Sequence, residues 1–264
     1  MLNDKQMAVI GKDIKILISN KRMIGALVVV PVIMAIVLPV IFLLIITYTP
    51  EDSSDMVELI KILQYASIKG DDTRDMLINL ILNYIIPMFF LLIPIIASSV
   101  MASGSFVGEK ERNTLETLLY CPLPIKQIFN AKIFASFLLS MTVSVCSFIA
   151  MIIAVEIFLL IAEHEFFIPN LNWLIMMLLA SPAASFISIN LIVRSSAKAR
   201  TSEEAQQSSL FLVVPLILLI ASQLTGIMIL DTCIFLTLGG VMAVIATLTF
   251  KGSYNKFNCE TLLK

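Results

Sequence analysis

Long apolar segments, separated by short polar ones, dominate the pattern of hydrophobic and polar positions along the chain. Six of them share a near absence of charged residues, and they lie at 24–48, 76–103, 133–161, 171–193, 208–225 and 230–250. A membrane-spanning helix needs roughly 20 apolar residues, and most of these segments reach that length. None of them alternates apolar and polar residues as the strands of a membrane barrel do. The pattern therefore predicts an all-α integral membrane protein in which residues 1–264 form one domain with six transmembrane helices.

The first 23 residues carry a different, amphipathic pattern. Apolar residues recur at steps of three and four, at Met7, Ile10, Ile14 and Leu17. Charged residues, among them Lys12, Asp13 and Lys15, fall between them. This spacing is typical of a helix with one apolar face. We predict that residues 1–23 form an interfacial helix whose lysines face the lipid headgroups.

Composition and charge support a membrane location. The chain is 59% hydrophobic and 14% charged, whereas a soluble domain is about half apolar and about a quarter charged. If the N-terminus is cytoplasmic, the basic residues that lie outside are only Lys61, Lys69 and Arg74. This bias follows the positive-inside rule. It predicts a multi-pass protein of the plasma membrane with both termini in the cytoplasm.

The first outside segment is acidic. Its carboxylates are Glu51, Asp52, Asp55, Glu58, Asp71, Asp72 and Asp75. A solvated loop is the simpler interpretation, and a vestibule that attracts cations is the alternative.

Residues that could carry enzymatic chemistry are scarce. The only histidine is His164, the four cysteines lack metal-ligand spacing, and no two glycines have the spacing of a P-loop. The pair Glu203-Glu204 resembles the paired glutamates of CAAX-type membrane proteases but lacks their accompanying arginine and histidines. The sequence therefore predicts no catalytic residue, no metal site and no cofactor bound by this chain. It also lacks the basic, aromatic-interleaved patch of a nucleic-acid-binding protein.

Several polar residues and prolines lie inside the predicted spans. Pro87 and Pro94 predict kinks in the second span. Serines share one face of the third span and of the fourth, which favours close helix packing. Glu156, the one acid within a span, lies near the outer end of the third. Lining a transport pathway is the alternative role, for which the candidates are Ser140, Ser144, Ser147, Glu156, Ser181 and Ser185.

A short charged segment, GEKERNTLETLLYC at 108–121, follows the second span on the predicted cytoplasmic side. Asn113 and Glu116 have the spacing of a capping box, and Pro122 ends the predicted helix. Its apolar face consists of Leu115, Leu118 and Leu119. Such a helix either covers the base of the bundle or fits a groove in a cytosolic partner.

Together with Pro122-Leu123-Pro124 and Lys132, this segment resembles the cytoplasmic signature of ABC-2-type exporter permeases. Asn113 stands where that family usually has glycine, and Asn130-Ala131 replaces its second glycine region. The resemblance implies a type V exporter-like fold in which 108–121 is a coupling helix. That helix docks into a separate cytosolic ABC ATPase, which binds the ATP. The residues that the resemblance assigns to coupling are Glu109, Glu111, Arg112, Leu115, Glu116, Leu118 and Leu119.

The resemblance also implies a second permease subunit, identical or related, and a pathway between the two subunits within the lipid bilayer. We therefore expect the membrane-spanning permease subunit of an ATP-binding cassette exporter. The alternative is a membrane assembly protein or an immunity or resistance protein that transports nothing.

Overall fold

The computed structural model describes residues 4–50, 73–112, 114, 124–162, 164, 166–225 and 231–256. Every regular element within these ranges is a helix. Six helices are long and apolar enough to cross a membrane, and they are Met23–Tyr48, Thr73–Glu111, Gln127–Ile161, Leu171–Ser196, Ser202–Leu224 and Thr232–Lys251. The predicted all-α class and the predicted number of six spanning helices are thus confirmed.

Two of the spanning helices are continuous and four are divided into consecutive segments. The continuous ones are α9 (Ile125–Ile161) and α14 (Thr232–Lys256). The divided ones are, in chain order, α2 (Lys21–Pro31), η1 (Val32–Val37) and α3 (Leu38–Tyr48); α5 (Thr73–Leu80), η2 (Ile81–Ile85), α6 (Ile86–Phe90) and α7 (Leu92–Glu111); α10 (Leu171–Ile175), η3 (Met176–Ala180) and α11 (Ser181–Ser196); and α12 (Ser202–Gln206), η4 (Gln207–Ser209) and α13 (Leu210–Leu224). The shorter α1 (Asp4–Ser19) precedes them.

Prolines explain where three of these helices change their winding. Pro39, Pro87 and Pro182 each occupy the second position of an α-helix that follows a π-helical segment. A proline has no N–H to give to the carbonyl four residues earlier, and its ring crowds that carbonyl. The carbonyls concerned are those of Ala35, Asn83 and Leu178, and each lies within the preceding segment η1, η2 or η3. The wider π turn moves the carbonyl away from the ring.

Pro94 accounts for the remaining break in the second span. The carbonyl four residues before it belongs to Phe90, where α6 ends, and Leu91 forms a turn before α7 begins. The second span is therefore irregular at both predicted prolines. It also continues beyond residue 103, the predicted end of the span, as far as Glu111.

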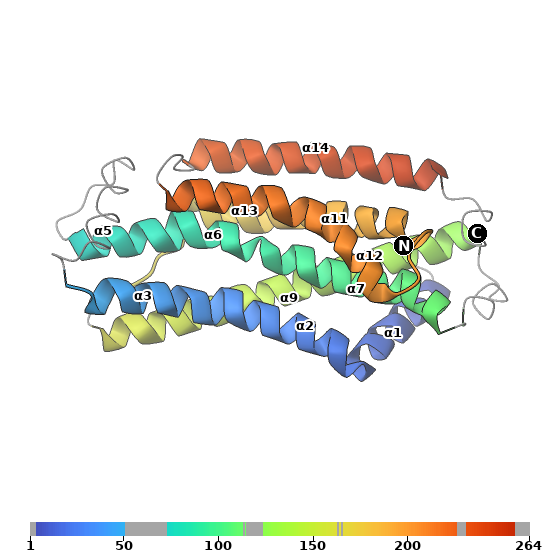
Figure 1. Cartoon of the computed structure of the whole chain (residues 1–264), viewed down its shortest axis with the longest axis horizontal. Helices are drawn as coiled ribbons and strands as arrows, with labels where there is room; N and C mark the ends of the chain where they lie inside the picture. Colours follow the sequence, from blue (N-terminus) through green and yellow to red (C-terminus); the bar gives the residue numbers. More distant parts are fainter. Residues whose placement is uncertain are drawn as a thin grey trace.

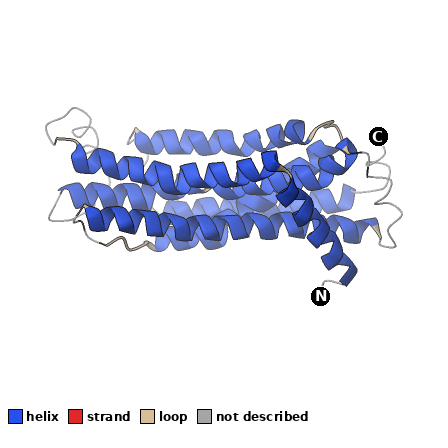
Figure 2. Ribbon diagram, turned by 90° about the horizontal axis from the view of Figure 1, so that it is seen from below, coloured by secondary structure: helices blue, strands red, loops and turns tan. Residues whose placement is uncertain are grey.

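The long helices run side by side, and α1 is set at an angle beneath one end of the bundle (Figures 1 and 2). We call this the α1 end. It also holds the start of α2, the last turn of α7, the start of α9 and the short α12. Of the spanning helices the second is the most deeply buried, because α7 packs against α2, α9, α11 and α12. Other helices expose apolar stripes, such as Ile149, Ile153 and Ile157 on α9, which suit contact with lipid.

Side chains from neighbouring helices satisfy the carbonyls of η2, at the opposite end of the bundle. Trp173 Nε1 donates to the Leu82 carbonyl at 3.0 Å, and Asn172 Nδ2 donates to the Asn83 carbonyl at 3.0 Å. A backbone carbonyl inside a bilayer has no water to bind, so each of these bonds replaces one lost from regular helix. The Trp173 ring also packs edge-on against Phe90, with centroids 5.4 Å apart.

Candidate functional site

Three helices bring charged side chains together inside the α1 end. The α1 helix contributes Lys12 and Asp13, α7 contributes Ser105 and Glu109 on successive turns of one face, and α9 contributes Lys132. We call these five residues the buried charge cluster. Asp13, Glu109 and Lys132 are each less than a tenth exposed. Such charges are tolerated in a protein interior only when they are paired.

The Lys132 ammonium is the centre of the cluster. Its Nζ lies 2.9 Å from Glu109 Oε2 and 3.9 Å from Asp13 Oδ2, and it donates to the Ser105 carbonyl. The Ser105 hydroxyl in turn donates to Asp13. On the solvent side, Lys12 Nζ lies 3.0 Å from Glu109 Oε1. One network of ion pairs and hydrogen bonds thus joins α1, α7 and α9.

The charges of the cluster balance one another in number, but their burial costs free energy of solvation. Two carboxylates face two ammonium groups, of which Lys132 is buried and Lys12 is about half exposed (46%). Burial raises the pKa of the Asp13 carboxyl above its ordinary value of 3.8, although Lys132 and the Ser105 hydrogen bond oppose that rise. The cluster therefore fixes three helix ends relative to one another, and removal of Lys132 alone would leave buried carboxylates without their partner.

Two residues of the cluster also belong to the stretch that resembles the ABC-2 signature. Glu109, which the resemblance assigns to coupling, has a buried carboxylate that is bound by Lys12 and Lys132. Lys132, the last residue of that stretch, is only 3% exposed, and its Nζ lies 5.6 Å from the centroid of the Phe106 ring. Both residues turn inward because partners of opposite charge meet them from helices that are distant in the sequence.

The other residues assigned to coupling lie next to this cluster or beyond the described residues. Glu111 closes the last turn of α7, and its Oε2 accepts from the Ser202 hydroxyl at 2.9 Å and from the Ser202 N–H at 3.2 Å. Arg112 is the C-terminal cap of α7 and is exposed. Four more coupling candidates lie outside the described residues, namely Leu115, Glu116, Leu118 and Leu119. The predicted coupling helix remains a prediction.

The predicted serine faces meet each other. Ser140 on α9 and Ser185 on α11 are fully buried, and their hydroxyls lie 3.1 Å apart. Each also donates within its own helix, as do the buried Ser144 and Ser147. Ser181 is buried on the same face of α11. The serines thus allow α9 and α11 to approach closely, which is the packing role expected of a small-residue face.

Glu156 has a local structural partner at the opposite end of the bundle. Its Oε1 accepts a hydrogen bond of 3.0 Å from the backbone N–H of Phe167, in the connection that leads to α10. Nearby in the chain, His164 Nδ1 lies 2.9 Å from Asp75 Oδ1. Asp75 is the one member of the predicted acidic group that the structure describes.

The sequence did not single out Asp13 and Ser105 as members of a site. Asp13 lies between Lys12 and Ile14 in the middle of a mainly basic amphipathic helix whose other acid, Asp4, is at its start, and this central position was the available signal. Ser105 precedes Glu109 by one helical turn, but nothing in the sequence showed that α1 and α9 meet α7 at this height.

Comparison with known proteins gives one result. A sequence model of the family described as "ABC-2 family transporter protein" matches residues 7–250. That range includes all of the buried charge cluster and nearly all of the six spanning helices. Neither the comparison with curated proteins nor that with solved structures gives a match.

Proposed function

The chain belongs to the ABC-2 family of transporter proteins, and from this membership we propose that it is the membrane-spanning permease subunit of an ATP-driven exporter. The observation that carries the proposal is the family match over residues 7–250, nearly the whole chain. Six apolar helices supply the membrane domain that such a subunit needs.

The energy source is a second protein. The sequence has no pair of glycines with P-loop spacing, so ATP binds to a separate cytosolic ABC ATPase. That subunit docks on the segment between α7 and α9, with the leucine face of 115–119 as its apolar anchor. The α1 end is then the cytoplasmic end, in agreement with the excess of lysine and arginine there.

The buried charge cluster supports this mechanism because it connects both flanks of the docking segment. Glu109 lies just before the segment and Lys132 shortly after it, and their ion pair of 2.9 Å joins the two flanks. Asp13 adds α1 to the same unit. A push on the segment therefore moves α1, α7 and α9 together, which is the rigid-body motion that alternating access requires.

Two such subunits form the transporter, and the pathway lies between them. The candidate serines are buried between α9 and α11 within one subunit, so we assign them to packing. The surfaces available for a second subunit are the exposed apolar faces, which include Phe211, Val214 and Leu218 on α13.

Substitution at the leucine face tests the proposal. Leu118→Asp places a charge in the anchor, whereas Thr117→Asp places the same charge on the opposite face of the predicted helix. We expect wild-type chain and the Thr117→Asp variant to co-purify with a P-loop ATPase, and Leu118→Asp to lose it. Recovery of equal amounts of that ATPase with both variants would contradict the proposal, and so would the absence of any ATPase from the wild-type preparation.

A further inference from the structure

A groove on the outer surface of the bundle lies between the first and third spanning helices. It has a volume of about 290 Å³ and is lined by one face of residues 27–36, in α2 and η1, and by one face of residues 142–150 of α9. The two helices pack together along this length. Ala35 and Ser147 in the lining are buried, whereas Cys146 is exposed. The groove is therefore open to the medium that surrounds the bundle.

The lining of the groove offers little to a polar ligand. Among the described residues that form it, those with polar side-chain atoms are Thr142, Cys146 and Ser147. The Thr142 hydroxyl donates to the Leu138 carbonyl at 2.8 Å. The Ser147 hydroxyl donates to the Val143 carbonyl at 2.6 Å, and a thiol is a weak donor. A hydrocarbon ligand suits such a groove, because a polar group buried there would find no good hydrogen bond.

The dimensions of the groove match a single extended chain. Leu27 and Ile36 are nine residues apart, which is a rise of about 14 Å along a helix. The volume divided by this length gives a mean cross-section of about 20 Å². A helix with its side chains is about 10–12 Å across, which is a cross-section of about 80 Å² or more. The groove therefore admits one hydrocarbon chain but not the body of another helix.

The depth of the groove places it in the half of the membrane next to the α1 end. The first span begins at Met23, so Leu27 lies about 6 Å along it and Ile36 about 20 Å along it, in a hydrocarbon core about 30 Å thick. Further along, larger side chains join the two helices, because Phe42 and Ile152 pack against the same hydrophobic cluster. A chain therefore enters from the leaflet at the α1 end and stops near the middle of the bilayer.

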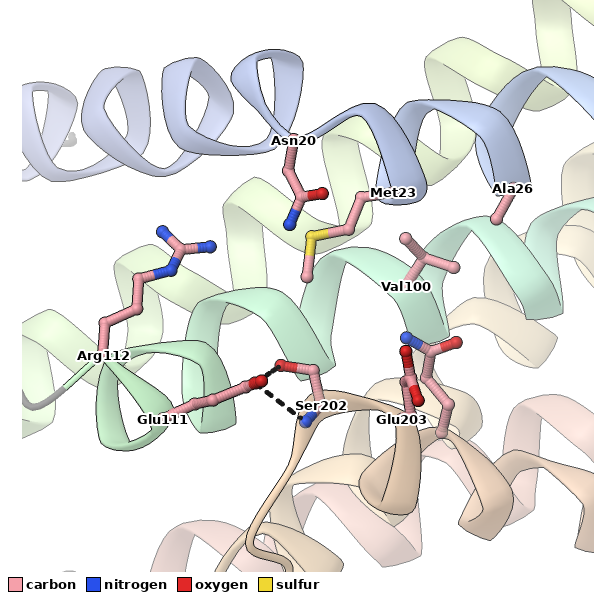
Figure 3. A pocket seen from close by; sticks show the side chains of 9 residues that line it. Asn20, Met23, Ala26, Val100, Glu111, Arg112, Ser202 and Glu203 are labelled. Carbon is pink, nitrogen blue, oxygen red and sulfur yellow. Dashed lines mark hydrogen bonds between the residues drawn. The ribbon is translucent and has the colours of Figure 1, made fainter.

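A cationic side chain lies at the entrance of the groove. Lys21, Gly25 and Val28 are four and three residues apart and share one face of α2, and Val28 lines the groove. A Cβ added at Gly25 would meet no atom within 4 Å, so the way between Lys21 and the groove is open. Figure 3 shows Met23, about half a turn away from Lys21, on the side of α2 that faces α7.

Lys21 is available to a ligand from the membrane surface. Its side chain is exposed, and none of the ion pairs among the residues that the structure describes includes it. It precedes Leu27 by about 9 Å of helix rise, which places its ammonium at the level where lipids present their phosphates. The entrance is thus complementary in charge to a phospholipid headgroup.

We propose that this groove holds one acyl chain of a phospholipid from the leaflet at the α1 end, with the lipid phosphate on Lys21. The seated chain fills the space between the first and third spans along residues 27–36. The proposal stands on the groove and its entrance, and it does not depend on an ATPase partner.

Photolabelling of the purified full-length chain tests the proposal. The probes are phosphatidylglycerol with a diazirine in the middle of one acyl chain, and the diacylglycerol with the same chains and no phosphate. In neutral detergent micelles, which dilute loosely bound lipid, we expect adducts of the phosphatidylglycerol probe at Cys146 and Ala150. Val145 and Ile149 lie at the same depth of α9 but do not line the groove, and they should be labelled several-fold less.

Substitution of Lys21 tests the phosphate contact. Native mass spectrometry in the same micelles gives the affinity of each probe. Lys21→Gln should lower the affinity for the phosphatidylglycerol probe about threefold, as expected for an exposed charge pair, and leave the diacylglycerol probe unchanged. Lys15→Gln, which removes an exposed lysine of α1, is the matched control and should bind as wild type does.

Two variants that fill the path of the chain test the groove itself. Cys146→Phe occupies the groove from α9, and its control Val145→Phe adds the same ring beside it. Gly25→Leu covers the entrance from α2, and its control is Gly240→Leu, because a Cβ at Gly240 of α14 also meets no atom within 4 Å. Both groove variants should lose binding of both probes, and both controls should retain it.

Four results would overturn the proposal. Equal labelling of Cys146 and Val145 would mean that lipid only coats this surface. Equal losses in each groove variant and its control would mean that the probes bind elsewhere. Equal effects of Lys21→Gln and Lys15→Gln would remove the phosphate contact. Disulfide-linked dimers through Cys146, formed when wild-type chain in phosphatidylcholine vesicles is oxidised, would mean that a second copy of the chain covers the groove.

Discussion

Removal of the central ammonium of the buried charge cluster is the perturbation whose outcome the structure specifies most closely. Lys132→Met keeps the length of the side chain and its contact with Phe106 but deletes the charge. Two buried carboxylates, Glu109 and Asp13, then face only Lys12, which is half exposed. We expect the free energy of unfolding to fall sharply.

The magnitude follows from the distances. At an effective dielectric constant of about 20, separations of 2.9 Å and 3.9 Å give attractions of about 6 and about 4 kcal/mol. The cost of desolvating the ammonium offsets a large part of this sum. Breaking a buried ion pair by removing one partner generally costs about 3–5 kcal/mol, and that is the loss we expect for Lys132→Met.

The assay is reversible unfolding of the purified chain in mixed micelles at neutral pH. Lys110→Met is the matched control, because Lys110 is near the same helix end and has no ion pair among the described residues. The triple variant Asp13→Asn, Glu109→Gln and Lys132→Met removes every buried charge and should recover most of the loss. A loss below about 1 kcal/mol for Lys132→Met, or a triple variant no more stable than the single one, would refute the reasoning.

Three further predictions concern Asp13, Trp173 and the serine contact. Burial raises the pKa of Asp13 in the folded state, so its contribution to stability is greatest below its ordinary value of 3.8 and is lost as the pH rises through the folded-state pKa. Asp13→Asn removes this titration and should flatten the dependence of the free energy of unfolding on pH across that range. An unchanged pH dependence would contradict this. Trp173→Phe leaves the Leu82 carbonyl without its donor and should cost about 1–3 kcal/mol in the same unfolding assay, so a stability equal to wild type would count against the bond. Ser140→Leu forces a large side chain into a contact of 3.1 Å with Ser185 and should cost about 1–3 kcal/mol, whereas Ser140→Ala should cost about 0.6 kcal/mol or less; equal losses in the two would argue against close packing.

The number of spans could be predicted because apolar length is a property of local sequence. Breaks in the second span could also be placed, since Pro87 and Pro94 each affect the carbonyl four residues earlier. The sequence did not show that the break at Pro87 would be a π-helical segment. It also did not show that Trp173, on another helix, would donate to the Leu82 carbonyl within η2.

The interior position of Lys132 could not be predicted for a related reason. Its place at the start of a span is typical of a lysine at the headgroup level. Its burial depends on Glu109 and Asp13, which come from two other helices. Local pattern gives the face on which a residue lies, as it did for Ser140 and Ser185, but not the pairing of charges between distant segments.

The central claim is that the segment between α7 and α9 contacts a nucleotide-hydrolysing partner. Its most direct test is site-specific photo-crosslinking in intact cells, with the crosslinking amino acid at position 118 or, as control, at position 117. The account predicts a single adduct from position 118 to a P-loop ATPase and little or none from position 117. Adducts to lipid or to the chain itself from both positions, with no ATPase among the products, would contradict it.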